Sequence, residues 1–349
     1  MTSTAVGLGE ENDLVVRGGS WREPLHFLRA LDNPWYRSLL DVQDVLTRST
    51  FSFFGERGLK AVQLPITTTS ISSPMGLGSD SSPVSIELFG VETYLADSMQ
   101  FLLEYACRHA SAGAFYLMPS FRGEAADESH LCQFYHAEAE IPGGIDDMMT
   151  LVEAYLRRLT ADIADQCSQA LATTAGDLGH IEAFLAHDGA FPRVTLEEAI
   201  VLLEDDSALV RHHPEGFRTL SRAGERRLID LFGGVVWLTE QDHAAVPFYQ
   251  AYVPGRPTQA QAADLLFGLG EVVGSGERHV TADDVRAALA QHEVDPTPYD
   301  WYLQLREASP LRTAGFGLGT ERYVAWLLNH HDIRDCQLLP RFNGQPAIP

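Results

Sequence analysis

The octapeptide at residues 315–322, Gly-Phe-Gly-Leu-Gly-Thr-Glu-Arg, constrains this chain more than any other stretch. Glycine at every second position removes the side chains from one face of a strand, so a ligand can approach the backbone there. Arg322, at the end of the run, is a permanent cation that can stack on a purine ring or bind phosphate oxygens. The octapeptide therefore predicts a nucleotide site, and a glycine strand kinked for packing is the alternative.

Length and composition bound the class of protein. The chain has 349 residues and is 45% hydrophobic, so it can bury a large core as one catalytic domain or two smaller ones. Its apolar runs are shorter than the roughly 18 residues that a membrane span needs, and its start lacks the pattern of a signal peptide. We therefore expect a cytoplasmic protein without a membrane partner, in which the four widely spaced cysteines stay reduced.

The charge balance bears on possible partners. Acidic residues outnumber basic residues 48 to 25, which leaves a net charge of -23. A protein that holds nucleic acid has to offset phosphate charge with lysine and arginine, so this balance disfavours a general nucleic-acid binder. A local group of basic residues, such as Arg222, Arg226 and Arg227, can still contact RNA.

A second stretch carries a more specific pattern. It reads Phe-Arg-Gly-Glu at 121–124, His-Leu-Cys-Gln-Phe at 130–134 and Glu-Ala-Glu at 138–140. This stretch resembles motif 2 of class II aminoacyl-tRNA synthetases, and residues 315–322 resemble their motif 3. The resemblance extends over residues 50–343, and within the class the sequence is most similar to the asparaginyl-tRNA synthetases. The resemblance implies an α+β fold in which an antiparallel sheet is flanked by helices.

The resemblance also predicts how the chain is divided. Residues 1–20 are expected to form a flexible N-terminal tail, and residues 21–349 a catalytic domain with a helical insertion at 141–190. The β-barrel anticodon domain of asparaginyl-tRNA synthetases has no counterpart in this pattern. Residues 58–66 resemble motif 1, whose strand ends at a proline, here Pro65, and builds a twofold dimer interface. We therefore expect a homodimer, with an edge strand closed by proline as the alternative.

The resemblance implies that the protein binds ATP and Mg²⁺. Arg122 and Arg322 are the implied catalytic residues, because fixed cations stabilise the charge that builds up on a phosphate under attack by a carboxylate. Asp264 and Glu271, seven residues apart, are implied to hold Mg²⁺, which prefers one or two carboxylates together with phosphate oxygens. The residues implied to bind the nucleotide are Glu124, His130, Phe134, Glu271, Gly319 and Arg322.

A further group of residues is implied to bind the amino acid. Glu104 lies where asparaginyl enzymes place a carboxylate, which suits an amide donor and repels a second carboxylate, so we expect asparagine or another amide. The alternative for Glu104 is a solvated helix residue, and the alternative for Ser98 is a helix cap. Arg278, seven residues after Glu271, is implied to bind the side chain. The complete set is Ser98, Gln100, Glu104, Glu138, Tyr249, Ser275 and Arg278.

Ser129, Arg312 and Thr313 are among the residues that depart from the family pattern. Ser129 replaces the arginine that usually precedes His130, and Arg312 and Thr313 replace the usual proline and histidine. The first change removes a positive charge that relatives offer to ATP, and the second can alter the acceptor step.

Together, the residues and the resemblance predict an ATP-dependent, AMP-forming amide synthetase. It would activate an amino acid similar to aspartate or asparagine as its adenylate and transfer the acyl group to ammonia or a small amine. Some archaeal relatives of asparaginyl enzymes are asparagine synthetases of this kind. The acidic composition and the missing barrel argue against tRNA as the acceptor. Two alternatives stay open: a truncated asparaginyl-tRNA ligase, and a non-catalytic regulatory paralogue of a synthetase.

Overall fold

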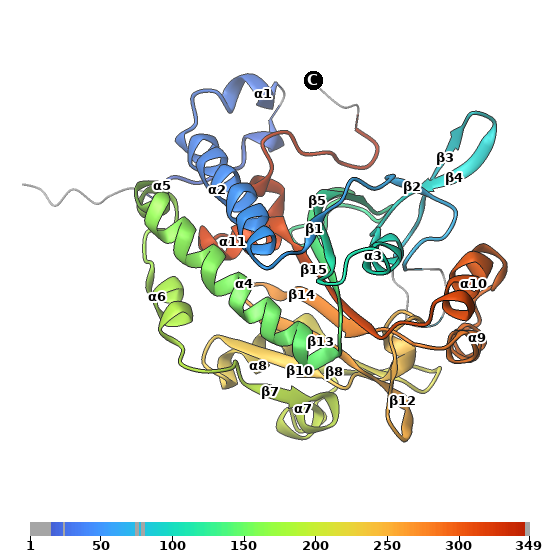
Figure 1. Ribbon diagram of the computed structural model, residues 1–349. Helices are drawn as coiled ribbons and strands as arrows, with labels where there is room; N and C mark the ends of the chain where they lie inside the picture. Colours follow the sequence, from blue (N-terminus) through green and yellow to red (C-terminus); the bar gives the residue numbers. More distant parts are fainter. Residues whose placement is uncertain (1–14, 24, 74–76, 78–80, 346–349) are drawn as a thin grey trace, which may run out of the picture.

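A computed structural model of the chain describes residues 15–23, 25–73, 77 and 81–345. Among these residues, a central sheet of eight strands has the order β1-β5-β6-β15-β14-β13-β10-β7. Its strands are β1 Lys60–Ala61, β5 Ala114–Phe121, β6 Gln133–Pro142, β7 Arg193–Thr195, β10 Val235–Thr239, β13 Ala262–Phe267, β14 Gly270–Glu277 and β15 Thr313–Gly319. Neighbouring strands are antiparallel except at the two ends, where β1 and β5, and β10 and β7, are parallel. The predicted antiparallel sheet flanked by helices is confirmed (Figure 1).

One face of the sheet is covered by two long helices. α2 (Pro34–Glu56) and α4 (Ile145–Gln166) pack on each other, and α4 lies across β14 and β15. Aromatic rings fill the interface, where the ring centroid of Phe54 lies 4.8 Å from that of Tyr155 and 4.9 Å from that of Phe115. This apolar layer holds β14 and β15 from one side and leaves their other face for polar side chains.

The opposite face of the sheet carries shorter elements. α3 (Gln100–Cys107) packs on β5 and β6, and α8 (Arg222–Leu231) packs on β13 and β14. Further helices are α1 His26–Arg29, α5 Ser168–Thr174, α6 Gly179–Ala186, α7 Leu196–Leu202, α9 Ala282–Gln291, α10 Asp300–Ala308 and α11 Thr320–Leu327. Further strands are β2 Thr67–Thr68, β3 Val84–Leu88, β4 Val91–Leu95, β8 Val210–His212, β9 Arg218–Leu220, β11 Tyr252–Val253 and β12 Arg256–Ala260. α3 and α8 thus stand on either side of β15, on the face opposite α4.

The motif 1 stretch forms a shorter strand than the resemblance implies. Only Lys60 and Ala61 make up β1, which lies at the edge of the sheet beside β5, and the chain leaves the sheet before Pro65. The homodimer stays a prediction. The expected insertion at 141–190 contains the three helices α4, α5 and α6.

Two residues of the stretch predicted to be an N-terminal tail, Val16 and Arg17, are hydrogen-bonded to the rest of the chain. Residues 1–14 lie outside the described residues. The backbone N–H of Val16 and a guanidinium N–H of Arg17 donate to the backbone oxygens of Thr173 and Thr174, each at 3.1 Å. The chain is therefore attached to the end of α5 at residues 16 and 17, within the range predicted to be flexible.

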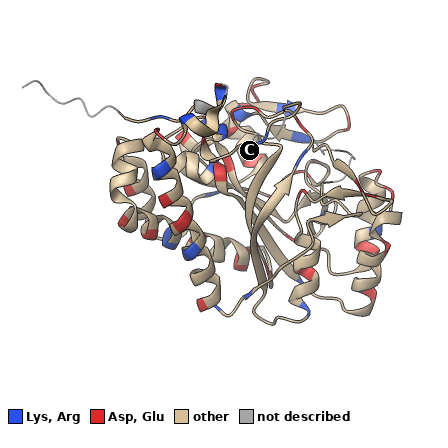
Figure 2. Cartoon of the chain, turned by 90° about the horizontal axis from the view of Figure 1, so that it is seen from above, with Lys and Arg blue, Asp and Glu red and all other residues tan. Residues whose placement is uncertain are grey.

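Charged residues lie mainly on the periphery of the molecule. Seen from above, the strands of the sheet run through the middle between outer helices, and most acidic and basic residues lie on helices and loops (Figure 2). Within the part of the chain that the structure describes, no helix is both long and apolar enough to cross a membrane.

Candidate active site

The glycine strand β15 forms the floor of a large cleft. The cleft has a volume of about 1220 Å³ and is lined by residues of β6, β13, β14, β15, α3, α8 and α11 and of adjoining loops. Gly315, Gly317 and Gly319 face the cleft, whereas Phe316 and Leu318 lie buried in the core on the other face. Side chains of a strand alternate between its two faces, which separates the bare face from the core face. β15 pairs in regular register with both neighbours, so the alternative of a kinked strand is wrong.

Two of these glycines make room for carboxylates. A β-carbon at Gly315 would lie 1.8 Å from Oε2 of Glu140, and one at Gly317 would lie 3.2 Å from Oε1 of Glu138. At Gly319 the nearest atom would be 4.0 Å away, on Arg322. The glycine pattern therefore accommodates buried acids at one end of the strand and leaves open space for a ligand at the other.

Two arginines lie at the open end. Arg322, in the first turn of α11, donates to the backbone oxygens of Glu271 (Nη1, 2.7 Å) and Ser129 (Nη2, 3.3 Å). The guanidinium carbon of Arg122 lies 5.7 Å from the ring centroid of Phe134. The Nε of Arg122 is buried and has no hydrogen-bond partner among the described residues. A buried guanidinium N–H without an acceptor costs free energy, and an anionic ligand removes that cost, so this end suits a phosphate group.

Three carboxylates form an acidic group near Arg322. Asp264 and Glu271 both face Gly274, where an added β-carbon would lie 3.7 Å and 2.8 Å from their oxygens. Burial and the charge of Glu271 raise the pKa of Asp264 well above its usual value, and the same causes raise the pKa of Glu225 to about 7. A divalent cation relieves such repulsion, so this donor set fits Mg²⁺ bound to two carboxylates and phosphate oxygens. Within the described part of the chain, no group of three or more His, Cys, Asp or Glu residues is placed to hold a metal by itself.

Glu138 is held as an anion in the middle of the cleft. The hydroxyls of Ser98 (2.6 Å) and Tyr116 donate to its Oε2, and Nδ1 of His136 lies 2.9 Å from its Oε1. Burial alone would raise the pKa of Glu138, but His136 and the hydroxyls outweigh burial and lower it. Ser98 Oγ also accepts the backbone N–H of Gln100 at 3.2 Å, but the N-cap residue of α3 is Met99 and not Ser98. A fixed carboxylate at this point suits a substrate ammonium group.

The cleft ends near Gly315 at a buried ion pair. Arg278 Nη2 lies 3.0 Å from Oε2 of Glu140, and Arg278 Nη1 donates to Oε1 of Gln250 at 3.0 Å. Burial raises the pKa of Glu140 to about 7, although Arg278 opposes the shift. The ring of Tyr249 lies 5.2 Å from the Arg278 guanidinium carbon and closes this end. Arg278 lines the cleft and offers hydrogen-bond donors to a polar substrate side chain, while Glu140, which is 0% exposed and outside the described lining, is the charge partner of Arg278.

Glu104 does not reach the cleft, contrary to the expectation that it contacts the substrate. It is 1% exposed, and its carboxylate accepts from Arg306 Nη2 and from the Tyr302 hydroxyl, both at 2.5 Å. The solvated-helix alternative is wrong as well. Gln100 and Glu104 lie one turn apart on α3, and their spacing does not tell which of them meets the cleft and which meets α10. Glu140, which the motif contains but to which no role was assigned, is the acid beside the substrate end.

Most of the predicted residues meet in this cleft. Those that line it are Ser98, Gln100, Arg122, His130, Phe134, Glu138, Tyr249, Asp264, Glu271, Ser275, Arg278, Gly319 and Arg322. Glu124 is absent from the described lining, and its Oε2 is buried without a hydrogen-bond partner there. The sequence patterns assigned no role to His136 or Glu225. His136 could be found from its spacing, because it lies two residues before Glu138 on the same face of β6, whereas Glu225 comes from a helix without a motif.

The fold and the cleft together define the catalytic domain of a class II aminoacyl-tRNA synthetase. The family model for tRNA synthetases class II (D, K and N) matches residues 24–343, so the chain belongs to this family.

Several relatives of this chain are named as asparagine–tRNA ligases or asparaginyl-tRNA synthetases. The asparagine–tRNA ligase of Lactococcus lactis subsp. cremoris (strain SK11) is 30% identical over 325 residues, covering 89% of this chain and 71% of the relative. The asparagine–tRNA ligase of Streptococcus sanguinis (strain SK36) is 29% identical over 347 residues, covering 96% of this chain and 75% of the relative. The crystal structure of asparaginyl-tRNA synthetase from Pyrococcus horikoshii complexed with asparaginyl-adenylate matches with a TM-score of 0.82 at 26% identity, over 90% of this chain and 71% of that chain.

These relatives contradict the expectation about partners. They are named as tRNA ligases and synthetases, so the family does not support a small-molecule acceptor in place of tRNA. The net charge was a poor guide to the partner, because it sums the charges of the whole chain, whereas a binding partner contacts only one part of the surface. Five arginines, at positions 211, 218, 222, 226 and 227, lie close together in this otherwise acidic sequence.

Proposed function

We propose that this protein is an ATP-dependent ligase that activates asparagine, or a closely similar amino acid, as an aminoacyl-adenylate. The observation that carries the proposal is the order of charged groups along β15. They are Arg322 beside Gly319, Glu138 beside Gly317, and Arg278 with Glu140 beside Gly315. An aminoacyl-adenylate presents its phosphate, its ammonium and its side chain in the same order. The Pyrococcus horikoshii relative, crystallised with asparaginyl-adenylate, supports this assignment.

At the nucleotide end, Phe134 supplies a ring for adenine to stack on, and Arg122 and Arg322 supply positive charge. Attack of the substrate carboxylate on the α-phosphate builds negative charge on the phosphate oxygens. Donors already held in place stabilise that charge without reorganising, which contributes about 100- to 1000-fold in rate for a single donor. Mg²⁺, held by Asp264 and Glu271, would neutralise phosphate charge when bound.

At the amino-acid end, Glu138 would receive the substrate ammonium and the Arg278–Glu140 pair its side chain. An asparagine side chain carries one carbonyl group, which matches the guanidinium donor of Arg278, and one NH₂ group, for which the carboxylate paired with Arg278 would be the acceptor. Aspartate would bring a second carboxylate next to Glu140, which is unfavourable in a buried site. This pairing favours asparagine over aspartate.

The acceptor of the acyl group is a separate question. The names of the relatives support tRNA, which corresponds to the asparaginyl-tRNA ligase alternative. The finer sequence hypothesis, amide formation with ammonia or an amine, has no observation among the described residues in its favour. The regulatory alternative is disfavoured because Arg122, Arg322, Asp264 and Glu271 all line the cleft.

The direct test is the amino-acid-dependent exchange of labelled pyrophosphate into ATP. The purified protein is assayed with asparagine, aspartate and their β-substituted analogues, with and without tRNA. We expect exchange with asparagine and much less with aspartate. Exchange that is absent with every amino acid, both with and without tRNA, would refute the proposal.

The acceptor is then tested in single-turnover reactions that start from the preformed adenylate. Labelled product is separated after addition of tRNA or of ammonia. Aminoacyl-tRNA is the expected product, and a free amide formed only with ammonia would reverse that expectation.

A further inference from the structure

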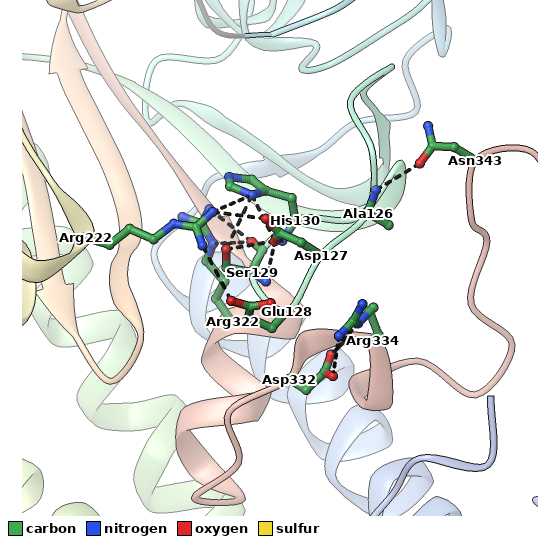
Figure 3. Close-up of polar contacts among 10 residues, drawn as sticks. All are labelled: Ala126, Asp127, Glu128, Ser129, His130, Arg222, Arg322, Asp332, Arg334 and Asn343. Atoms are coloured by element: carbon green, nitrogen blue, oxygen red, sulfur yellow. Dashed lines mark hydrogen bonds and ion pairs between the residues drawn. The ribbon is translucent and has the colours of Figure 1, made fainter. Parts of the chain in front are cut away.

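Arg222 bridges the cleft from α8 to the loop at residues 122–130. It is the first residue of α8, and its side chain points at the loop (Figure 3). Its Nη2 lies 3.0 Å from Nδ1 of His130 and 3.3 Å from Oδ2 of Asp127. The side chain is 44% exposed and lines the cleft. Arg222 is therefore a solvent-accessible cation at the cleft wall, with a hydrogen bond to His130 and ion pairs to Asp127 and, at 4.0 Å, to Glu128.

The loop does not depend on Arg222 for its position. The backbone N–H of Ala126 donates to Oδ1 of Asn343 at 2.9 Å, and the N–H of Ile333 donates to the backbone oxygen of Glu128 at 3.0 Å. Arg322 donates to the backbone oxygen of Ser129 at 3.3 Å. These contacts hold the backbone of the loop, and Figure 3 shows Asn343 meeting Ala126 away from Arg222. Arg222 can therefore change partner while the loop stays in place.

Asp127 does not depend on Arg222 either. Its Oδ1 accepts the backbone N–H groups of Ser129 at 2.7 Å and His130 at 2.8 Å, in a turn within the loop. The contact to Arg222 uses the second oxygen, Oδ2. If Arg222 turns away, Asp127 keeps its two backbone partners, so the exchange leaves no buried carboxylate without donors.

Arg222 and Arg322 lie at the same end of the cleft. They contact neighbouring residues of one loop, His130 and Ser129. Arg322 also borders the acidic pair that suits Mg²⁺, since its Nη1 lies 3.9 Å from Oε2 of Glu271. Residue 129 is a serine, so the loop itself brings no cation at this point.

We propose that Arg222 is a phosphate-binding residue for the outer phosphates of ATP, and that it exchanges the Asp127 carboxylate for phosphate oxygens when the nucleotide binds. A triphosphate carries more charge than a carboxylate and accepts a guanidinium through two parallel hydrogen bonds. α8 thus supplies the positive charge that the loop lacks at Ser129. This inference rests on the proposed ATP-dependent function.

The test is equilibrium binding of ATP and of adenosine, measured by calorimetry in the full chain without amino acid. Arg222→Ala is expected to weaken ATP binding roughly 10- to 100-fold and to leave adenosine binding unchanged, because adenosine has no phosphates. Arg222→Lys is expected to recover part of the loss. Arg227→Ala, which removes the same charge from an exposed position of α8 outside the described cleft lining, is the matched control and should bind ATP as the wild type does.

A second variant tests the exchange of partners. Asp127→Asn keeps Oδ1 as an acceptor for the two backbone N–H groups and removes the charge that competes with phosphate. It is expected to tighten ATP binding several-fold.

Three outcomes would overturn the inference. They are an unchanged ATP affinity in Arg222→Ala, an equal loss of ATP and adenosine binding in that variant, or an equal loss of ATP binding in Arg227→Ala. Wild-type protein that binds neither ligand would instead refute the proposed function, and this inference with it.

Discussion

Arg278 and Glu140 form a buried ion pair, with 3.0 Å between Nη2 and Oε2, against the bare face of Gly315. Removing one partner of a buried pair leaves an uncompensated charge, whereas an isosteric change alters the chemistry and keeps the volume. The pair therefore allows a test of amino-acid selection.

Glu140→Gln is expected to shift selection from asparagine toward aspartate. The variant removes the carboxylate that repels an acidic side chain and leaves Arg278 free to bind one. Pyrophosphate exchange with asparagine should fall roughly 10-fold or more, and the ratio of aspartate to asparagine turnover should rise. Glu87→Gln, at an exposed position of β3, is the charge-matched control. An unchanged ratio in Glu140→Gln would contradict the assigned role.

Arg322→Ala is expected to abolish adenylate formation while the protein stays folded. The side chain is partly exposed and is not part of the apolar core, so the melting temperature should change little. The rate of exchange should fall by about 100-fold or more, because a fixed cation at the reacting phosphate is lost. Arg226→Ala, exposed on α8, is the control. Unchanged turnover in Arg322→Ala would mean that the ATP site is wrongly placed.

Glu104→Ala is expected to reduce stability without changing selection. It leaves Arg306, which is 1% exposed in its side chain, without its counter-charge, and such losses cost about 3–5 kcal/mol. Urea denaturation should show this loss in the free energy of unfolding. The ratio of aspartate to asparagine turnover in the folded protein should equal that of the wild type, and a changed ratio would restore Glu104 to the substrate site.

Acid is expected to destabilise the protein through buried histidines. Burial lowers the pKa of His243 and of His279 to about 3, against about 6.5 in the unfolded chain. Below pH 6.5 the unfolded state therefore binds protons that these two histidines do not bind in the folded state, so their contribution to stability falls as the pH falls. The raised pKa values of Glu140 and Glu225 contribute in the opposite direction. Each histidine contributes about 1.4 kcal/mol per pH unit between pH 6.5 and its folded pKa.

The measurement is urea unfolding at pH 7.5, 6 and 5. His279→Gln should reduce the slope of stability against pH, whereas His212→Gln, at a side chain that is 58% exposed, should leave it unchanged. An equal slope of stability against pH in His279→Gln and in the wild type would contradict this prediction.

Binding of Mg²⁺ with ATP is expected to release protons. Burial and Glu271 raise the pKa of Glu225 to about 7, so this carboxyl is partly protonated at neutral pH. A cation favours the ionised form, and the affinity for Mg²⁺ with ATP should therefore increase from pH 6 to pH 8. Calorimetry in buffers of different ionisation enthalpy measures the protons directly. Glu225→Gln should release fewer protons, and equal release would contradict the assignment.

Much of the site follows from local sequence. The alternation of glycine with Phe316 and Leu318 predicts a strand with one bare face and one core face, because side chains on a strand alternate. Arg322 follows this strand directly, so its place at the end of the bare face is also local. The resemblance to class II synthetases adds the fold and the family, both of which are confirmed.

Other relationships depend on how distant segments meet. Asp264 and Glu271 lie on separate strands, and a shift of register after Leu265 accompanies their approach to Gly274. No rule of side-chain alternation within one strand predicts that approach, because the hairpin and its irregular pairing decide it.

Glu104 and Glu140 also show that tertiary packing decides what a side chain contacts. The resemblance implied a substrate contact for Glu104 and assigned no role to Glu140 in motif 2, so the sequence by itself does not determine which of the two meets the substrate region. Where α3 meets α10, Glu104 pairs with Arg306. The pairing of β6 with β15 instead brings Glu140 next to Gly315 and Arg278. Arg222 likewise meets Asp127 only because α8 folds back across the cleft, 95 residues along the chain. Local periodicity thus determines which face a side chain takes, and tertiary packing decides what it meets there.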